Sequence, residues 1–245
     1  MSRFNGKTAL VTGASAGIGK EISQHLLAEG ARVISVSRRE LEIESDKVTS
    51  LCVDLADPEA VKACADHLRA SEQVDILVNN AGVVRNTMLG KITDDEFDML
   101  NNLHVRAAIT LSQAVLPNMK AKGFGRIVNM SSRAVVGLQQ RTVYAATKAA
   151  MIAMTRTWAL ELGPLGITVN AIAPGPVVTD MLTTDIPEES DKAKSLAASL
   201  PTRRLGKAED VARATLFFAD PDNGWVTGQT LFVCGGASLG SLTSI

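Results

Sequence analysis

Short β-rich runs alternate with helical stretches along the whole chain, and this alternation constrains the fold more than any other feature of the sequence. The run KTALVT at 7–12 precedes one helical pattern, and the run RIVNM at 126–130 precedes another. Strands that alternate with helices form a parallel sheet with helices on both faces. We therefore predict an α/β fold with a doubly wound, mostly parallel sheet.

Seven strands are predicted, each from a short apolar run that suits burial on both faces of a sheet. They lie at 7–12, 31–36, 48–53, 75–78, 126–130, 167–172 and 230–233. Helices are expected from the glycine-rich loop to Gly30 and over 60–68, 93–122, 142–162 and 210–218, and 93–96 has the sequence of a capping box. No linker or repeat divides the chain, so we predict one domain, residues 1–245, with a mobile lid at about 180–203.

Composition and charge exclude several classes of function. The 245-residue chain has a net charge of −1 with acids and bases interleaved, so we expect no nucleic-acid or membrane partner. No apolar run approaches the roughly 18 residues of a membrane span. The three cysteines are widely spaced and form no cluster with histidine, which argues against disulfides and a metal site. We expect a cytoplasmic protein without a metal.

A glycine-rich loop lies between the first predicted strand and the first predicted helix. Gly13, Gly17 and Gly19 form the pattern G-x-x-x-G-x-G directly after the strand at 7–12. Glycines let the backbone approach a pyrophosphate closely, and the N-terminus of the next helix supplies free amides and a partial positive charge. This placement predicts a nucleotide-binding loop.

Two arginines stand where the second strand ends. An NAD enzyme places Asp or Glu there against the adenosine ribose, whereas this chain has Ser37, Arg38 and Arg39. A carboxylate would repel a 2′-phosphate, whereas an arginine binds it with paired hydrogen bonds. The pattern favours NADPH over NADH. The alternative is an ordinary pair of solvated arginines.

Polar and small residues also follow the third and fourth strands. Asp54 can accept a hydrogen bond from an adenine amino group, or it can cap the helix that starts near Asp57. The segment NNAG at 79–82 suits close packing against a cofactor, although the same residues are common in turns. Both segments are therefore candidates for the cofactor site.

The helix at 142–162 carries a tyrosine and a lysine on one face. Tyr144 and Lys148 are four residues apart, and Tyr144 is the only tyrosine in the chain. At an effective dielectric constant of about 20 and a separation of about 4 Å, the ammonium would stabilise the phenolate by roughly 4 kcal/mol. Such an attraction lowers the tyrosine pKa by about three units. The pair predicts a general acid and base that works near pH 7.

Six short motifs follow one another along the chain. They are Thr12-Gly13-x-x-x-Gly17-Ile18-Gly19, Asp54, Asn79-Asn80-Ala81-Gly82, Ser132, Tyr144-x-x-x-Lys148 and Pro174-Gly175-x-x-x-Thr179. On these motifs the chain resembles the short-chain dehydrogenase/reductase superfamily from about residue 7 to residue 236, and it is similar to the bacterial 3-oxoacyl reductase-like members. The resemblance implies a single Rossmann-type domain and an NADPH-preferring oxidoreductase that reversibly reduces a ketone to a secondary alcohol.

The resemblance also implies roles for individual residues. Tyr144 is implied to be the acid and base, Lys148 to bind the nicotinamide ribose, and Ser132 to hold the substrate oxygen. The cofactor, NADPH or NADP+, is implied to contact Gly13, Ser15, Gly17, Ile18, Gly19, Ser37, Arg38, Asp54, Leu55, Asn80, Ala81, Gly82, Tyr144, Lys148, Pro174, Gly175, Val177 and Thr179.

The catalytic serine requires a choice between two neighbours, because Ser131 and Ser132 both follow the fifth strand. The register of the strand from Arg126 selects Ser132, since a strand decides which face each side chain points to. The family's usual spacing of thirteen residues to the tyrosine would instead select Ser131. We prefer Ser132.

His104 departs from the family pattern. The resemblance places it where the family has a catalytic asparagine that helps to hold a water in a proton relay behind the lysine. A neutral imidazole can also donate and accept, so His104 could continue the relay and titrate near neutral pH. Alternatively, His104 is a core histidine and the relay is weak.

The substrate is expected to be a small carbonyl or alcohol compound. Arg85, Arg133 and Arg141 could give the mouth of the site a positive potential for an anionic carboxylate or acyl thioester, or they are solvated loop arginines. Acyl-carrier-protein reductases often have a basic residue where this chain has Leu165, which argues against that partner.

The resemblance further implies a homo-oligomer, a dimer or a tetramer, that packs through helices near 107–119 and 149–160. An alternative function is a cofactor-binding sensor or a non-catalytic partner subunit that kept the fold. The departure at His104 motivates this alternative, and the intact Ser132, Tyr144 and Lys148 argue against it.

Overall fold

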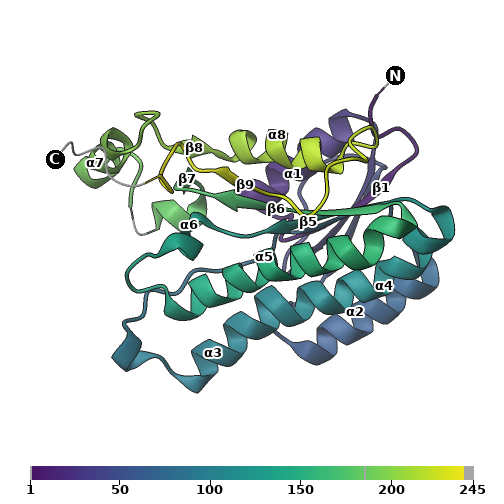
Figure 1. Ribbon diagram of the computed structural model, residues 1–245, viewed down its shortest axis with the longest axis horizontal. Helices are drawn as coiled ribbons and strands as arrows, with labels where there is room; N and C mark the ends of the chain where they lie inside the picture. Colours follow the sequence, from purple (N-terminus) through teal and green to yellow (C-terminus); the bar gives the residue numbers. More distant parts are fainter. Residues whose placement is uncertain (1, 185, 240–245) are drawn as a thin grey trace.

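The computed structural model describes residues 2–184 and 186–239, and a seven-stranded sheet lies at its centre (Figure 1). The strands are β1 (Thr8–Thr12), β2 (Arg32–Ser37), β3 (Val48–Cys52), β4 (Ile76–Asn79), β5 (Gly125–Met130), β6 (Ile167–Pro174) and β9 (Thr230–Val233). They lie in the order β3-β2-β1-β4-β5-β6-β9, and every neighbouring pair is parallel. The predicted α/β sheet is confirmed, and it is entirely rather than mostly parallel.

Helices cover both faces of the sheet. The pair α1 (Gly17–Ala28) and α8 (Ala208–Ala219) packs on one face, whereas α2 (Pro58–Ser71), α4 (Ala107–Lys122) and α5 (Thr142–Leu162) cover the other (Figure 1). A cluster of buried apolar side chains lies under each layer. Because burial of one Val, Leu or Phe side chain contributes about 1.5–3 kcal/mol, these clusters make the sheet a firm support for the loops at its ends.

The remaining elements are short. Turns of 3-10 helix span Leu89–Lys91, Arg133–Val136 and Gly163–Leu165. The elements α6 (Asp180–Thr183), α7 (Asp191–Ser199), β7 (Val177–Val178) and β8 (Gly206–Lys207) gather at one end of the molecule (Figure 1). The segment 180–203, for which the sequence predicts a lid, lies in this region. Within the predicted domain, Met1, Asp185 and residues 240–245 lie outside the described residues.

The predicted helix at 93–122 is interrupted by a wide turn. The helix α3 (Asp94–Asn101) is followed by a π-helix at Asn102–Arg106, and α4 continues from there. A π-turn holds one residue more than an α-turn and therefore changes which side chains face inward. Within this turn His104 is only 2% exposed.

Two helix N-termini differ in detail from the prediction. Thr93 caps α3, but the Glu96 carboxylate accepts from Thr87 Oγ1 at 2.6 Å instead of completing the capping box. The side chain of Asp57, rather than that of Asp54, caps α2. Asp54 accepts from the backbone amide two residues later, at 3.0 Å. The alternative that Asp54 is a helix cap is therefore wrong.

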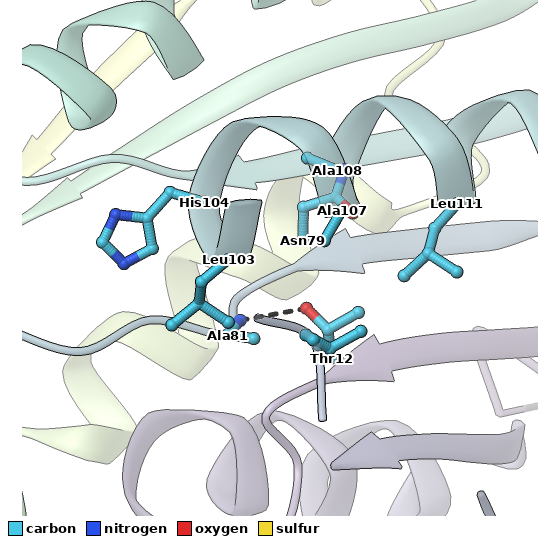
Figure 2. A pocket seen from close by; sticks show the side chains of 9 residues that line it. Thr12, Asn79, Ala81, Leu103, His104, Ala107, Ala108 and Leu111 are labelled. Atoms are coloured by element: carbon cyan, nitrogen blue, oxygen red, sulfur yellow. Dashed lines mark hydrogen bonds between the residues drawn. The ribbon is translucent and has the colours of Figure 1, made fainter. Parts of the chain in front are cut away.

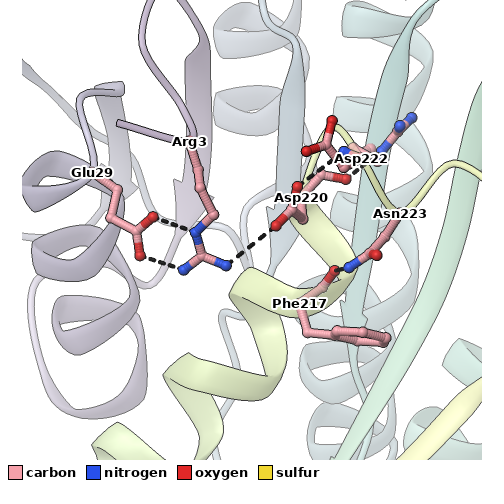
Figure 3. Close-up of polar contacts among 7 residues, drawn as sticks. Arg3, Glu29, Phe217, Asp220, Asp222 and Asn223 are labelled. Atoms are coloured by element: carbon pink, nitrogen blue, oxygen red, sulfur yellow. Dashed lines mark hydrogen bonds and ion pairs between the residues drawn. The ribbon is translucent and has the colours of Figure 1, made fainter. Parts of the chain in front are cut away.

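Ion pairs hold the N-terminal segment at the end of the sheet opposite the strand carboxyl ends. Arg3 pairs with Glu29, just after α1, and with Asp220, just after α8, the second at 3.2 Å (Figure 3). Buried Arg126 donates to the backbone carbonyls of Asp220 and Pro221 at 3.1 and 2.7 Å. These contacts tie the N-terminal segment and the start of β5 to the end of α8.

Residues 2–184 and 186–239 contain neither a membrane-spanning helix nor a cluster of three metal-ligating side chains. No helix in that part of the chain is long and apolar enough to cross a membrane. Within the same residues, no group of three His, Cys, Asp or Glu side chains is arranged to hold a metal ion.

Candidate active site

The strand order reverses between β1 and β4, which is where open α/β sheets bind their ligands. The glycine loop leaves β1 at this point. Gly13 and Gly17 have φ angles of +67° and +52°, and a Cβ atom on Gly19 would lie 2.2 Å from the Gly13 carbonyl oxygen. Ala16, which precedes α1, places no side-chain cap on the first helical amides. The bare loop and these amides fit a pyrophosphate.

Thr12 locks the glycine loop to the segment that follows β4. Its Oγ1 accepts from the backbone amides of Asn80 and Ala81, both at 2.9 Å, and Figure 2 shows the bond from Ala81. The Asn80 side chain donates in return to the Thr12 carbonyl oxygen at 2.9 Å. The sequence-based prediction gives Thr12 no role of its own. A hydroxyl on the last residue of a strand, directly before the glycines, is the signal that could have indicated one.

The residues predicted to meet the adenosine half of the cofactor lie beyond β2 and β3. Ser37 is buried, and its Oγ accepts from the Ser15 amide at 3.3 Å, so its hydroxyl hydrogen remains able to donate. Arg38 follows on the surface. Asp54 is exposed, whereas Leu55 is buried. A donor hydroxyl beside an exposed guanidinium suits a phosphate.

The segment after β6 reaches across to the glycine loop. A Cβ atom on Gly17 would lie 3.3 Å from Thr179 Cγ2, so the two residues are in close proximity. Thr179 Oγ1 donates to the Val177 carbonyl at 3.4 Å. Gly175 is packed so tightly on Cys234 that its Cβ would approach the Cys234 Cα to 2.6 Å. The predicted carboxamide-binding segment therefore closes one side of the site.

The two candidate serines have different surroundings. Ser132 Oγ accepts from the Ala134 amide at 3.1 Å, and the Ser132 side chain also lies close enough to Tyr144 to lower the pKa of its hydroxyl. Ser131 is buried, and its Oγ donates to the backbone carbonyl of Lys148 at 2.7 Å. The structure thus brings Ser132 to the tyrosine and uses Ser131 to attach β5 to α5.

Lys148 lies on the same face of α5 as Tyr144, but its ammonium is hydrogen-bonded to a backbone carbonyl of β5. Its Nζ donates to the Met130 carbonyl at the end of β5, at 2.9 Å, and lies 5.9 Å from the centre of the Tyr144 ring. Burial lowers the pKa of Lys148 to about 8. The side chain is therefore mostly an ammonium at pH values below about 8.

The expected lowering of the Tyr144 pKa by Lys148 is wrong for the protein alone. Burial raises the pKa of Tyr144, and the hydrogen bond from Ser132 and the charge of Arg141 offset only part of this rise. The prediction assumed a separation of about 4 Å at an effective dielectric constant of about 20 and left the cost of burial out. In the fold the burial of the hydroxyl is the larger effect, so Tyr144 is held in its protonated form.

His104 lies close to the same turn. Its Nδ1 is 2.8 Å from Thr147 Oγ1, and its Nε2 accepts from the Val83 amide at 3.2 Å. Burial and, to a smaller extent, the charge of Lys148 lower the pKa of His104 to about 2. The expectation that His104 titrates near neutral pH is therefore wrong. Thr147, a partner that the prediction missed, lies 43 residues away in the sequence, and no local signal connects the two.

A small cavity lies beside the π-helix. It has a volume of about 10 Å³, and its lining includes Thr12, Asn79, Leu103 and His104 (Figure 2). Such a volume accommodates about one water molecule. The cavity is therefore too small for a substrate and belongs to the packing of α4 against the loops.

The three arginines proposed for the mouth of the site come from two paired segments. Thr87 N donates to the Gln140 carbonyl at 3.0 Å, which joins the segment of Arg85 to that of Arg141. Arg141 is near enough for its charge to lower the pKa of Tyr144. Arg85 is exposed, and Arg133 is half-buried directly after Ser132.

Comparison with known proteins agrees with this arrangement. A family model described as Enoyl-(Acyl carrier protein) reductase matches residues 13–238. A solved structure described as a short chain dehydrogenase/reductase family protein is 37% identical with a TM-score of 0.87, over 97% of this chain and 100% of that chain. The chain belongs to the short-chain dehydrogenase/reductase superfamily.

Several members of the superfamily match over almost their whole length. BbsD of Thauera aromatica, a subunit of (2S)-((R)-hydroxy(phenyl)methyl)succinyl-CoA dehydrogenase, is 37% identical over 95% of this chain and 97% of its own. The 3-oxoacyl-(acyl-carrier-protein) reductase FabG of Haemophilus influenzae is 37% identical over 96% and 100%. A solved blue fluorescent protein from a metagenomic library, in complex with NADPH, is 34% identical with a TM-score of 0.83, over 96% and 98%.

These matches make the chain an NAD(P)-dependent short-chain dehydrogenase/reductase that acts on CH–OH groups. The glycine loop with its clashing Cβ positions and the uncapped start of α1 are the features of this structure that fit the dinucleotide.

Proposed function

We propose that this dehydrogenase reversibly reduces a ketone to a secondary alcohol, with Tyr144 as the proton donor. The observation that carries the proposal is the approach of the Ser132 side chain to the half-buried Tyr144, close enough to lower the tyrosine pKa, with Lys148 one turn further along α5. Two hydroxyl groups therefore lie together at the carboxyl edge of the sheet, and the buried Lys148 ammonium lies 5.9 Å from the centre of the Tyr144 ring. Such a group can protonate an oxygen and stabilise the charge that develops on it.

In the proposed reaction, the chemistry that a bound nicotinamide supplies is the hydride, which adds to the carbonyl carbon. Tyr144 donates its proton to the carbonyl oxygen, and Ser132 donates a hydrogen bond to the same oxygen. Lys148 binds the nicotinamide ribose, and its ammonium stabilises the phenolate that Tyr144 becomes. Burial of Tyr144 supports the direction of this transfer, because it keeps the hydroxyl protonated before the reaction.

The natural substrate class is proposed to be an anionic carbonyl compound. The names of BbsD and FabG refer to thioesters of coenzyme A and of acyl carrier protein. Arg133 and Arg141 flank Ser132 and Tyr144 in sequence, and the charge of Arg141 acts on Tyr144. A positive potential at this place would favour substrates that carry a carboxylate or a phosphate-bearing carrier.

The closing test of the proposal is a substrate screen. Consumption of NADPH is followed by its absorbance with neutral ketones, 3-oxo acids and 3-oxoacyl thioesters, and its formation from NADP+ is followed with the matching alcohols. We expect turnover of at least one ketone class, and faster turnover of anionic members. Tight NADPH binding with no turnover of any carbonyl or alcohol class would favour the non-catalytic alternative.

NADPH is proposed as the preferred cofactor because Ser37 and Arg38 stand where an acidic residue would mark an NAD enzyme. Replacing Arg38 with aspartate should lower the ratio of kcat/KM for NADPH to kcat/KM for NADH by about 10- to 100-fold. This factor corresponds to the free energy that one charge-assisted hydrogen bond contributes. Arg39→Asp is the matched control, since Arg39 is also exposed and makes the same charge change. Equal shifts in both variants would show that long-range charge, not a specific contact, decides the preference.

The remaining proposals concern the whole chain. Residues 1–245 are proposed to form one domain in which 180–203 closes over the substrate. A homo-oligomer is proposed to form through the outer faces of α4 and α5, where Leu160 is 81% exposed. Sedimentation at several protein concentrations tests the oligomer.

A further inference from the structure

Both nitrogens of the buried His104 ring have a fixed partner. A backbone N–H can only donate, so the Val83 amide at 3.2 Å makes Nε2 the acceptor and places the ring hydrogen on Nδ1. Nδ1 then donates to Thr147 Oγ1 at 2.8 Å. The ring has no nitrogen left for a water molecule, so a proton relay through it would have to break one of these bonds.

Thr147 extends this connection to the turn of α5 from Tyr144 to Lys148, the catalytic turn. Its hydroxyl accepts from His104 and donates to the backbone carbonyl of Tyr144 at 2.9 Å. Thr147 is 2% exposed and lies between Tyr144 and Lys148 in the sequence. The imidazole is therefore bonded, through one hydroxyl, to the turn that carries both proposed catalytic groups.

Gly82 lies close to both the His104 ring and the Lys148 ammonium. A Cβ atom on Gly82 would lie 3.0 Å from His104 Nε2 and 3.2 Å from Lys148 Nζ. The Lys148 ammonium is itself fixed to the Met130 carbonyl. Because Nε2 binds the amide of the next residue, Val83, the ring determines how closely this loop approaches the ammonium.

We propose that His104 is a positioning residue whose neutral ring bridges the Val83 amide and the Thr147 hydroxyl, and so holds the loop at 82–83 and the catalytic turn at their working separation. The ring also packs edge-on against Tyr144, with centroids 5.7 Å apart. This inference rests on the proposed function, since it assigns a role toward Tyr144 and Lys148. It excludes the imidazole from proton transfer, and burial together with the nearby Lys148 ammonium disfavours a positive charge on the ring.

Three substitutions separate the two hydrogen bonds. An asparagine amide reaches the place of Nδ1, so His104→Asn keeps the bond to Thr147. A glutamine amide reaches the place of Nε2, so His104→Gln keeps the bond to Val83. His104→Leu keeps neither. We expect His104→Leu to lower kcat by about 10- to 100-fold, as small misplacements of catalytic groups do, with the other two variants between it and the wild type.

A double-mutant cycle tests whether the connection acts as a unit. Thr147→Val removes the hydroxyl at nearly constant shape. The double variant Thr147→Val/His104→Asn should lower kcat by clearly less than the product of the two single-variant factors. Thr155→Val is the matched control. Thr155 is a buried threonine on the same helix whose hydroxyl accepts from Asn129 and donates to the Met151 carbonyl. Thr155→Val should lower the melting temperature without lowering kcat.

The outcomes discriminate between positioning and proton transfer. The positioning role would be overturned if added imidazole restored the activity of His104→Leu, or if the pH profile of kcat lost a limb in that variant. Wild-type kcat in all variants would overturn it as well. Should His104→Leu not fold, the cycle with His104→Asn decides. Tyr144→Phe is measured alongside: wild-type activity there overturns the proposed function, whereas an inactive Tyr144→Phe with a fully active His104→Leu overturns only this inference.

Discussion

Replacement of Tyr144 by phenylalanine is expected to lower kcat for ketone reduction by about 10²- to 10⁴-fold, the range that one general acid contributes. This loss corresponds to about 3–5 kcal/mol in the activation barrier. Phenylalanine keeps the ring and its edge-on contact with His104, and it removes only the hydroxyl that lies near Ser132. Steady-state consumption of NADPH with the best ketone from the screen measures the effect.

The dissociation constant for NADPH serves as the control for Tyr144→Phe. It should change far less than kcat, because the lost proton transfer occurs only in the transition state. A variant that binds NADPH normally and turns over at the wild-type rate would remove Tyr144 from the mechanism.

The titration of Tyr144 can be observed directly in the same experiment. Tyr144 is the only tyrosine in the chain, so the ultraviolet absorbance of the phenolate reports this residue alone. Burial raises its pKa, and the midpoint for the folded protein without cofactor should therefore lie above the ordinary value of about 10. A midpoint below 10 would show that the charge of Lys148 outweighs burial.

Gly19→Ala is expected to produce the second large effect, loss of cofactor binding. The new methyl group would lie 2.2 Å from the Gly13 carbonyl oxygen and 2.6 Å from Asn80 Nδ2, so the glycine loop has to move. Overpacking of this kind costs about 1–3 kcal/mol. If the displaced loop loses that amount of interaction with the pyrophosphate, the dissociation constant rises by about 5- to 150-fold. Titration of NADPH fluorescence measures this change.

Gly163→Ala is the matched control for Gly19→Ala. A Cβ atom on Gly163 meets no atom within 4 Å among the described residues, and its backbone has the right-handed helical conformation. This variant should bind NADPH like the wild type. Equal affinity in Gly19→Ala and the wild type would mean that the loop does not hold the pyrophosphate in the proposed way.

Much of the fold was predictable because its signals are local. A parallel strand buried on both faces is a continuous apolar run, and the runs at 31–36 and 167–172 differ from β2 and β6 by at most two residues at either end. The π-helix at Asn102–Arg106 was missed, since the helical pattern of the sequence continues through it. Whether a turn widens depends on what its side chains contact on other elements.

The same distinction applies to the candidate site. The choice of Ser132 over Ser131 rests on the two-residue period of a strand, and the structure places Ser132 beside Tyr144. The expectation that His104 titrates near neutral pH was wrong, because the sequence does not reveal that the ring is buried and bonded to Val83 and Thr147. Hydrogen bonds between residues far apart in the sequence leave no periodic signal.

The sequence by itself determined the parallel α/β fold, the glycine loop at Gly13–Gly19 and the Tyr144–Lys148 turn, because each depends on neighbours a few residues apart. Tertiary structure alone decided the protonation of this site. Burial of Tyr144 and Lys148, the Met130 carbonyl on the ammonium and the neutral His104 all arise where β4, β5, the π-helix and α5 meet. A pKa depends on solvation and on charges from every direction, and only the folded chain sets these.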